Sequence, residues 1–337
     1  MKKLFLILTL IIGLISCENF DKTHPDFDYT TGFFPYQFPV RTLVLGDYIY
    51  DNANDNAHKF VISVAMGGVY ENTRDRVFDF EVDETLCNQI KFSAGGDIIK
   101  ALPSSYYTLS STDKITIPKG KLNGGIEVQL TDAFFNDPLA IKNSYVVPLR
   151  LINSNDVDSI LLGKSGNLTP DPRVASDWDI VPKNFTMFAV KYINEYHGTY
   201  FYYGASSVKD ATNTVIENTA YSTPYIENNP VSSLETTGRN QVSLTTNLHS
   251  LVITGSITML LDFSGNNCTI VGAPGSTYTI SGTGEFKSKA YTWGNKQRDG
   301  IVLNFTVSNG VNTYTASDVM VIRDRAVVME IYDPAVY

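Results

Sequence analysis

Acidic residues in one strand-like segment are the first groups whose spacing suits a reaction. Asp79, Glu81 and Asp83 alternate along this segment, and Glu84 follows directly. Glycoside hydrolysis needs two carboxyl groups that lie about 5–9.5 Å apart across a sugar. Alternate residues of a strand share one face, so these carboxylates are most simply the solvated side of a strand. The endoglycosidase signature D-x-x-D-x-D-x-E is absent from the chain, which favours the same interpretation.

Two segments rich in Asn and Asp offer oxygen ligands of the kind that calcium takes. They are formed by Asn153, Asn155, Asp156 and Asp158, and by Asp51, Asn54 and Asp55. Calcium needs about six to eight oxygen ligands, and neither segment fits the D-x-[DN]-x-[DN]-G pattern. Asn and Asp are also common turn residues. The chain has 4 histidines and neither a CxxC nor an HExxH motif, so we expect no metal and no cofactor.

The N-terminus carries the most specific short motif. Lys2 and Lys3 precede an apolar run over residues 4–15, which ends at Leu14-Ile15-Ser16-Cys17. The run is shorter than the roughly 20 residues that span a membrane, and its proportions are those of a signal peptide. The motif resembles the bacterial lipobox, whose cysteine is lipidated and becomes the new N-terminus. We therefore expect a signal peptide over 1–16 and two acyl chains on Cys17 that hold the protein on a membrane.

Aromatic residues beside polar ones are a second group with a chemical use. The chain has 20 Tyr and 18 Phe but 2 Trp. A sugar ring stacks its C–H face on an aromatic ring, while nearby polar side chains bond its hydroxyls. Two dense groups fit this pattern and supply the candidate glycan-binding residues Trp293, Tyr291, Asn295, Arg298, Tyr200, Tyr202 and Tyr196. The alternative is that these rings pack a core.

Strand-like segments separated by turns must position these residues. The first of them lie at 38–46, 59–68, 76–83, 106–130 and 144–152. Turns about every 8–12 residues predict an immunoglobulin-like β-sandwich over 25–163, after a tether over 17–24. Pro148 suggests that its strand lies at a sheet edge or carries a bulge.

A composition change separates the sandwich from a second β-rich part. Residues 164–183 contain 3 prolines and show no periodicity, so we expect a linker there. Alternating segments return beyond it, and Asn309-Gly310 is a strong hairpin signal. The chain is thus predicted to be all-β, with a second sandwich or barrel over 184–337. Within this part, alternation over 200–203 places Tyr200 and Tyr202 on one strand face, and one face should be core.

Charge limits the classes of partner. The 337 residues carry a formal net charge of −9. Binding to a nucleic-acid backbone needs clustered Lys and Arg, so we expect no nucleic-acid partner.

Four stretches together resemble one protein family. They are GGIEVQLTDAFFNDPLAIKNSYVVPLRLINSNDVDSILLG (124–163), DWDIVPKNFTMFAVKYINEYHG (177–198), YTWGNKQRDGIVLNFTV (291–307) and DVMVIRDRAVVMEIYDP (318–334). They are similar to Bacteroidetes surface lipoproteins that join an N-terminal domain of unknown function, also found on some glycan-degrading enzymes, to a β-rich C-terminal domain. The resemblance implies a polysaccharide-utilisation locus, an outer-membrane glycan importer and its starch-binding-like partner.

Together these features predict a lipid-anchored outer-membrane protein, exposed at the cell surface, that binds a glycan without cleaving it and passes it to the importer. One alternative is an assembly subunit of the importer that touches no sugar. Another is a glycoside hydrolase, although two modest β-domains leave no room for a (β/α)₈ barrel of about 250 residues.

Overall fold

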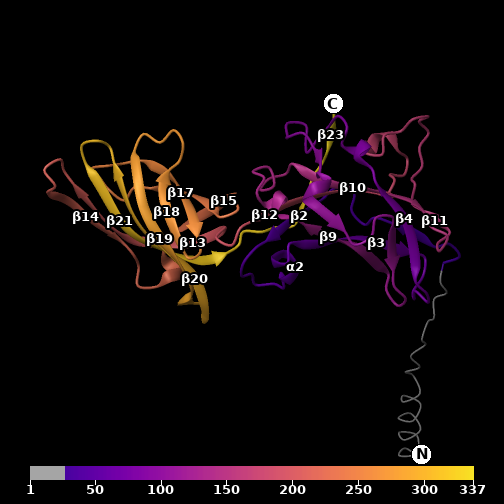
Figure 1. Cartoon of the computed structure of the whole chain (residues 1–337), viewed down its shortest axis with the longest axis horizontal. Helices are drawn as coiled ribbons and strands as arrows, with labels where there is room; N and C mark the ends of the chain where they lie inside the picture. Colours follow the sequence, from indigo (N-terminus) through magenta and orange to yellow (C-terminus); the bar gives the residue numbers. More distant parts are fainter. Residues whose placement is uncertain (1–26) are drawn as a thin grey trace, which may run out of the picture.

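The computed structural model describes residues 27–337 as two β-rich bodies (Figure 1). The predicted signal peptide, tether and lipidated Cys17 lie outside these residues. The helices among residues 27–337 are short: α2 (Ala53–Asn56), α3 (Asp132–Phe135), η1 (Glu84–Cys87), η2 (Ser104–Tyr106), η3 (Ala175–Asp177) and η4 (Ile226–Asn228). None of the helices in this range is long and apolar enough to cross a membrane.

The N-terminal body is a sandwich of two sheets. The first has the order β11-β1-β3-β9-β7, with β1 (Thr31–Phe33), β3 (Lys59–Gly67), β7 (Tyr107–Leu109), β9 (Asn123–Leu130) and β11 (Ser159–Ile160). The second has the order β22-β2-β12-β10-β4-β8, with β2 (Pro39–Val44), β4 (Arg76–Val82), β8 (Lys114–Ile117), β10 (Tyr145–Asn153), β12 (Phe185–Ile193) and β22 (Glu330–Ile331). Two further pairings involve β6 (Lys100–Ala101) with β10, and β5 (Ile90–Lys91) with β23 (Ala335–Val336).

Alternating side chains fill the space between these sheets. Ile62 and Val64 of β3 are buried in the same core as Phe78 and Phe80 of β4. The residues between them point away from this core, as the period of two predicts. The predicted all-β class and the N-terminal β-sandwich are confirmed.

Strand β12 lies in the sandwich, although the sequence suggested that the second part begins there. It pairs with β10 on one side and with β2 on the other. Both of its faces are buried: Tyr192 joins the core between the sheets, while Phe185 and Met187 join a second core on the outer face. A strand whose two faces are both apolar must be packed on both sides. The two cores provide this packing for β12, one on each face of the sheet.

The segment over 164–183 folds onto the sandwich. The indole N–H of Trp178 donates to the Asp171 carbonyl at 2.7 Å. Arg173 pairs with Asp171 and donates to the carbonyls of Leu86 and Asn88. The change from sandwich to barrel therefore comes after β12.

The edge position predicted from Pro148 is wrong, because β10 is an interior strand between β12 and β4. The alternative, a bulge in this strand, is present as a register shift between Leu151 and Asn153. Proline has no N–H to donate, and none is needed toward β4, because that strand ends at Val82. Beyond this end, the Asp83 N–H donates to the Pro148 carbonyl.

The C-terminal body is a closed antiparallel barrel. Its eight strands are β13 (Gly198–Lys209), β15 (Val231–Gly238), β16 (Gln241–Asn247), β17 (Ser256–Ser264), β18 (Asn267–Gly272), β19 (Thr279–Trp293), β20 (Lys296–Ser308) and β21 (Thr313–Asp324). Each pairs with the next, and β21 closes the ring by pairing with β13 over its length. A further strand, β14 (Val215–Tyr221), pairs with the second half of β13.

Side chains fill the barrel interior. Leu244, Leu261, Leu303 and Met320 come from four different strands and are fully buried in one cluster. Eight strands enclose a space about wide enough for side chains alone, or for one small ligand. Here side chains occupy it, so a ligand site must be sought outside the barrel.

The last part of the chain forms a hairpin in the barrel and then returns to the sandwich. The turn at Asn309-Gly310 forms the predicted hairpin between β20 and β21, with Gly310 at φ 87°. After β21 the chain returns to the sandwich (Figure 1). There β22 pairs with β2, and β23 pairs with β5.

Candidate functional site

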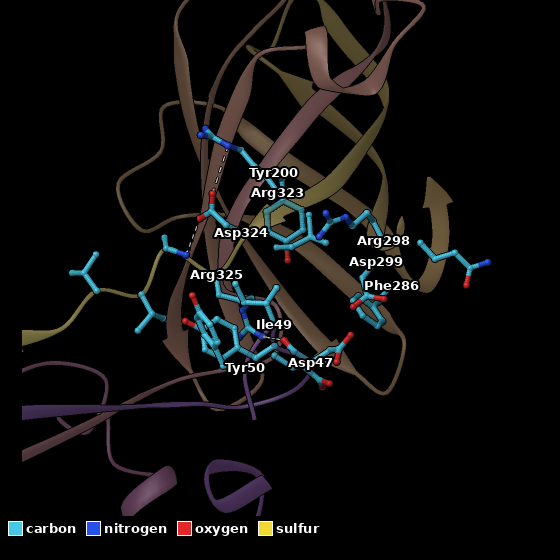
Figure 2. A pocket seen from close by; sticks show the side chains of 17 residues that line it. Asp47, Ile49, Tyr50, Tyr200, Phe286, Arg298, Asp299, Arg323, Asp324 and Arg325 are labelled. Atoms are coloured by element: carbon cyan, nitrogen blue, oxygen red, sulfur yellow. Dashed lines mark hydrogen bonds and ion pairs between the residues drawn. The ribbon is translucent and has the colours of Figure 1, made fainter. Parts of the chain in front are cut away.

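A cavity of about 580 Å³ opens where the barrel meets the sandwich (Figure 2). The sandwich contributes the loop over 47–50. The barrel contributes Tyr200 of β13, Phe286 in the middle of β19, and side chains at the start of β20 and the end of β21. The strap over 325–328, which leaves the barrel, completes the wall. A pocket with aromatic and aliphatic walls and a few polar groups is the usual form of a small-ligand site.

The loop over 47–50 forms an aromatic lip. Gly46 begins it at φ 83°, a backbone conformation that favours glycine. The rings of Tyr48 and Tyr50 meet edge to face at 5.4 Å. Tyr50 is 67% exposed and Ile49 71%, although both line the pocket. The lip therefore presents apolar surface to solvent.

Asparagine side chains hold this lip in place. The Asn52 amide donates to the carbonyls of Val44 and Gly46, both at 2.8 Å. The Asn56 side chain accepts from the Gly46 N–H at 2.8 Å. The aromatic rings are thus mounted on a loop whose base is fixed before any ligand arrives.

The β19–β20 hairpin supplies the opposite wall. Gly294 and Asn295 occupy its two-residue turn at φ 58° and 57°, which is the type I′ geometry. Next to the turn, the Trp293 indole donates to the Ile322 carbonyl at 3.0 Å and packs edge-on against Phe201, with centroids 5.1 Å apart. The Arg298 guanidinium lies 4.2 Å from the centre of the Trp293 ring.

The Arg298 side chain is the cationic group of the pocket wall next to the hairpin turn. Its Nε is buried, and no hydrogen bond or ion pair joins its guanidinium to another residue in the range 27–337. What the described part of the chain gives this guanidinium is the cation–π contact with Trp293.

Unlike Arg298, three acidic residues of the pocket face groups of opposite polarity. Asp299 accepts from the Lys289 N–H at 2.7 Å, and Asp324 pairs with Arg323 at 3.5 Å. Asp47 lies 3.8 Å from the Lys289 ammonium. Three of the lining carboxylates thus already face donors.

Arg325 fixes the floor of the pocket. It is buried and donates to the carbonyls of His197, Asp47, Leu45 and Asn194, at 2.7, 2.8, 3.0 and 2.6 Å. Burial lowers the pKa of Arg325, while Tyr200 and the carboxylates of Glu195, Asp299 and Asp47 oppose this. Arg325 thus binds backbone carbonyls on both bodies, whereas its neighbours Arg323 and Asp324 form an ion pair with each other.

The seven candidate platform residues fall into two environments. Tyr196, Tyr200 and Tyr202 are buried within the barrel core, and the Tyr200 hydroxyl donates to the Tyr196 carbonyl at 2.7 Å. All three rings are buried, so the prediction of an exposed platform is wrong for them, but Tyr200 lines the pocket between sandwich and barrel (Figure 2). The face of β13 that holds Tyr200 and Tyr202 is the core face.

The other four candidates lie together on the β19–β20 hairpin. Arg298 reaches the pocket, while Trp293 is half-buried behind it and Asn295 is exposed in the turn. Tyr291 lies against Gly300, where a Cβ would come within 2.4 Å of its ring. The hairpin therefore brings these residues together, with Arg298 nearest to a ligand.

Tyr48 and Tyr50 were missed by sequence reasoning. The segment GDYIYD places two tyrosines between a glycine and acidic residues. An aromatic pair in a polar turn is the same signal that pointed to Trp293, and it identifies this lip equally well.

The acidic candidates serve the sandwich. Asp79 pairs with Lys114 and Asp83 with Arg150, each at 2.7 Å. Asp156 accepts from the Val77 N–H at 2.9 Å, while Asp55 accepts from the Val44 N–H and pairs with Arg41. Within residues 27–337, no group of three or more His, Cys, Asp or Glu side chains is placed to hold a metal ion.

Comparison with known proteins places the chain in a family. Residues 27–158 match a family model for an N-terminal domain, and 195–326 match a domain of unknown function, DUF5627. A crystal structure of a Bacteroides ovatus protein of unknown function is 36% identical, with a TM-score of 0.86, over 92% of this chain and 100% of that one. The chain belongs to the same family as this protein. The DUF5627 match coincides with the barrel, and the resemblance to Bacteroidetes proteins with a domain of unknown function is confirmed.

Two other Bacteroides ovatus structures match more distantly. A multidomain protein that includes DUF1735 is 11% identical, with a TM-score of 0.42, over 88% of this chain and 94% of that one. A protein named as a proposed carbohydrate-binding protein is 12% identical, with a TM-score of 0.29, over 87% of this chain and 98% of that one. At these TM-scores neither match bears on the function of the DUF5627 barrel. A comparison with curated proteins found none that matches.

Proposed function

We propose that this chain is a lipid-anchored protein of the outer membrane, exposed at the cell surface, that binds a glycan without cleaving it and passes it to an outer-membrane importer. The observation that carries the proposal is the pocket between sandwich and barrel. In Figure 2, Tyr50 and Ile49 lie on one side of it, and Arg298 and Asp299 on the other.

This arrangement suits the two sides of a sugar ring. The C–H face of a pyranose packs against an exposed aromatic ring, and its hydroxyls need placed donors and acceptors. Tyr50 offers the ring, while Gln297, Arg298 and Asp299 offer the polar groups. The lip and the hairpin come from different bodies, so a ligand here contacts both.

A membrane anchor would keep such a pocket at the cell surface. The lipobox-like motif at Cys17 supports this part of the proposal. Labelling of the full chain with a radioactive fatty acid should mark the wild type and not Cys17→Ser. Equal labelling of both would contradict the anchor without affecting the pocket.

Affinity electrophoresis of the purified protein in gels that contain one polysaccharide each tests the binding function. We expect at least one polysaccharide to retard migration, with no new reducing ends after prolonged incubation. Normal migration in every gel would contradict glycan binding. Release of reducing ends from a retarding polysaccharide would contradict the non-catalytic role.

An importer-assembly subunit is the second candidate. The observation that favours it is a group of exposed apolar side chains where the chain returns to the sandwich, Val328, Met329 and Ile331 of β22. Co-purification with outer-membrane proteins, together with normal migration in every polysaccharide gel, would select this role.

A further inference from the structure

The strongest unexplained feature of the pocket is the Arg298 guanidinium. A buried donor without a partner is costly, so an unsatisfied Nε in a native fold calls for an explanation. Trp293 covers one face of the guanidinium and thereby removes water from it. Because Nε itself is buried, a ligand in the pocket would meet the Nη groups of this positive charge, for which residues 27–337 provide no hydrogen-bond acceptor.

The neighbouring carboxylates do not fill this role. Asp299 also accepts from the Ser288 hydroxyl at 3.3 Å, in addition to the Lys289 N–H. Asp324 accepts from the Ala326 N–H at 2.9 Å as well as pairing with Arg323. Glu195 is exposed and lies beside Gly46 at the other side of the pocket. None of these acids is bonded to Arg298.

We infer that the pocket takes an acidic glycan whose anionic substituent, the carboxylate of a uronic acid or a sulfate ester, binds the Arg298 guanidinium. The inference rests on the proposed function and specifies its ligand class. A charge-assisted hydrogen bond from arginine to such a group is among the stronger polar contacts in proteins. Tyr50 would pack against the ring that carries the anion or against its neighbour.

The net charge of the protein helps to distinguish a specific contact from non-specific binding. At −9 the chain repels polyanions as a whole, so non-specific ion exchange does not favour acidic glycans. Preference for an acidic glycan would therefore report a local contact. Its loss on removal of one cation would identify that contact.

The test compares acidic polysaccharides with matched neutral forms. The probes are polygalacturonate and alginate, each beside its carboxyl-reduced form, and dextran sulfate beside dextran. Affinity is measured for the wild type, Arg298→Gln and Arg74→Gln, which removes the same charge from the sandwich surface near Asp156. We expect one acidic probe to bind roughly 10- to 100-fold more tightly than its neutral form. Arg298→Gln should abolish that preference, and Arg74→Gln should keep it.

The outcomes separate this inference from the proposed function. A preference for the carboxylates or for the sulfate identifies the source of the anion. Equal binding of acidic and neutral forms, or binding of neutral polysaccharides alone, overturns the acidic-ligand inference and leaves glycan binding intact. A preference that survives in Arg298→Gln also overturns it. Failure to bind any polysaccharide, in this set or in a wider panel, overturns both.

Discussion

Asp318 is an acid that lies fully inside the barrel. Its carboxylate accepts hydrogen bonds from the hydroxyls of Tyr202 and Tyr221, and Tyr314 lies within 3.5 Å of the Tyr221 hydroxyl. Burial raises the pKa of Asp318 to about 6, because the charged form loses water, and the two hydroxyls offset only part of this. The tyrosines explain how a carboxylate is accommodated in an apolar barrel.

This pKa predicts a pH-dependent stability. Between about pH 4 and pH 6 the folded protein binds a proton at Asp318 that the unfolded chain has lost. The stabilisation from protonated Asp318 is therefore present at low pH and is lost as the pH rises through 6. Relative to Asp318→Asn, we expect the wild type to lose about 2 kcal/mol of unfolding free energy from pH 4 to pH 7. Urea denaturation at several pH values measures this, and parallel pH profiles for the two proteins would contradict it.

The buried tyrosines also show the limit of sequence reasoning at this scale. Alternation correctly separates Tyr200 and Tyr202 from Phe201, but it does not say which face is covered. Tyrosine is amphipathic, and its hydroxyl can find a partner in a core as readily as in solvent. Tyr196 bonds the Gly265 carbonyl at 3.1 Å, and Tyr192 bonds the Phe135 carbonyl at 2.8 Å. Much of the tyrosine surplus thus serves the core.

At the scale of elements, the β19–β20 hairpin is the part of the site that the sequence located. Its turn residues and its polar-flanked Trp293 are visible in the printed chain. What the hairpin faces is set by pairing far away in sequence, because Trp293 bonds Ile322 of β21. The lip at 47–50 meets the hairpin only through tertiary packing, so local patterns could not join them.

A double-mutant cycle tests whether Trp293 acts through Arg298. We expect Trp293→Ala and Arg298→Ala each to lower the unfolding free energy, and the double variant to lose about 0.5–1 kcal/mol less than the sum. The reason is that either change alone already removes the cation–π contact. Urea denaturation of the four proteins provides the values. Additive losses would show that the two side chains contribute independently.

At the scale of the whole molecule, Arg325 makes several of the hydrogen bonds that hold sandwich and barrel together. Its guanidinium bonds Leu45 and Asp47 on one side and His197 on the other. A second contact pairs Arg239 with Asp132 at 2.8 Å. The pocket lies between the bodies, so its shape depends on these contacts.

Removal of the Arg325 contacts should loosen the two bodies. We expect Arg325→Met to lower the unfolding free energy by about 3 kcal/mol or more, because four buried carbonyls lose their donor. Arg323→Met, at a half-exposed neighbouring position, should cost about 0.5 kcal/mol or less. Calorimetry should also show separate transitions for Arg325→Met. A small loss, equal to that of Arg323→Met, would contradict the clamp.

The domain plan was predictable in part. Alternation and turn spacing indicate two β-rich parts, and the structure has them. The placement of β12, and the return of β22 and β23 to the sandwich, were not predictable, because strands from distant segments cover the faces of these elements. The composition of residues 164–183 predicted a linker between the domains. The segment instead packs on the sandwich, which composition does not reveal.

The central claim is that a glycan binds in the pocket between sandwich and barrel. The most direct measurement is isothermal titration of the retarding glycan into the wild type, Tyr50→Ala and Tyr225→Ala. Tyr225 is a matched control because it is 65% exposed, close to the 67% of Tyr50, and lies on the barrel outside the pocket. We predict that Tyr50→Ala weakens binding roughly tenfold, about 1.4 kcal/mol, while Tyr225→Ala binds as the wild type does. Unchanged affinity in Tyr50→Ala, or an equal loss in Tyr225→Ala, would contradict the account.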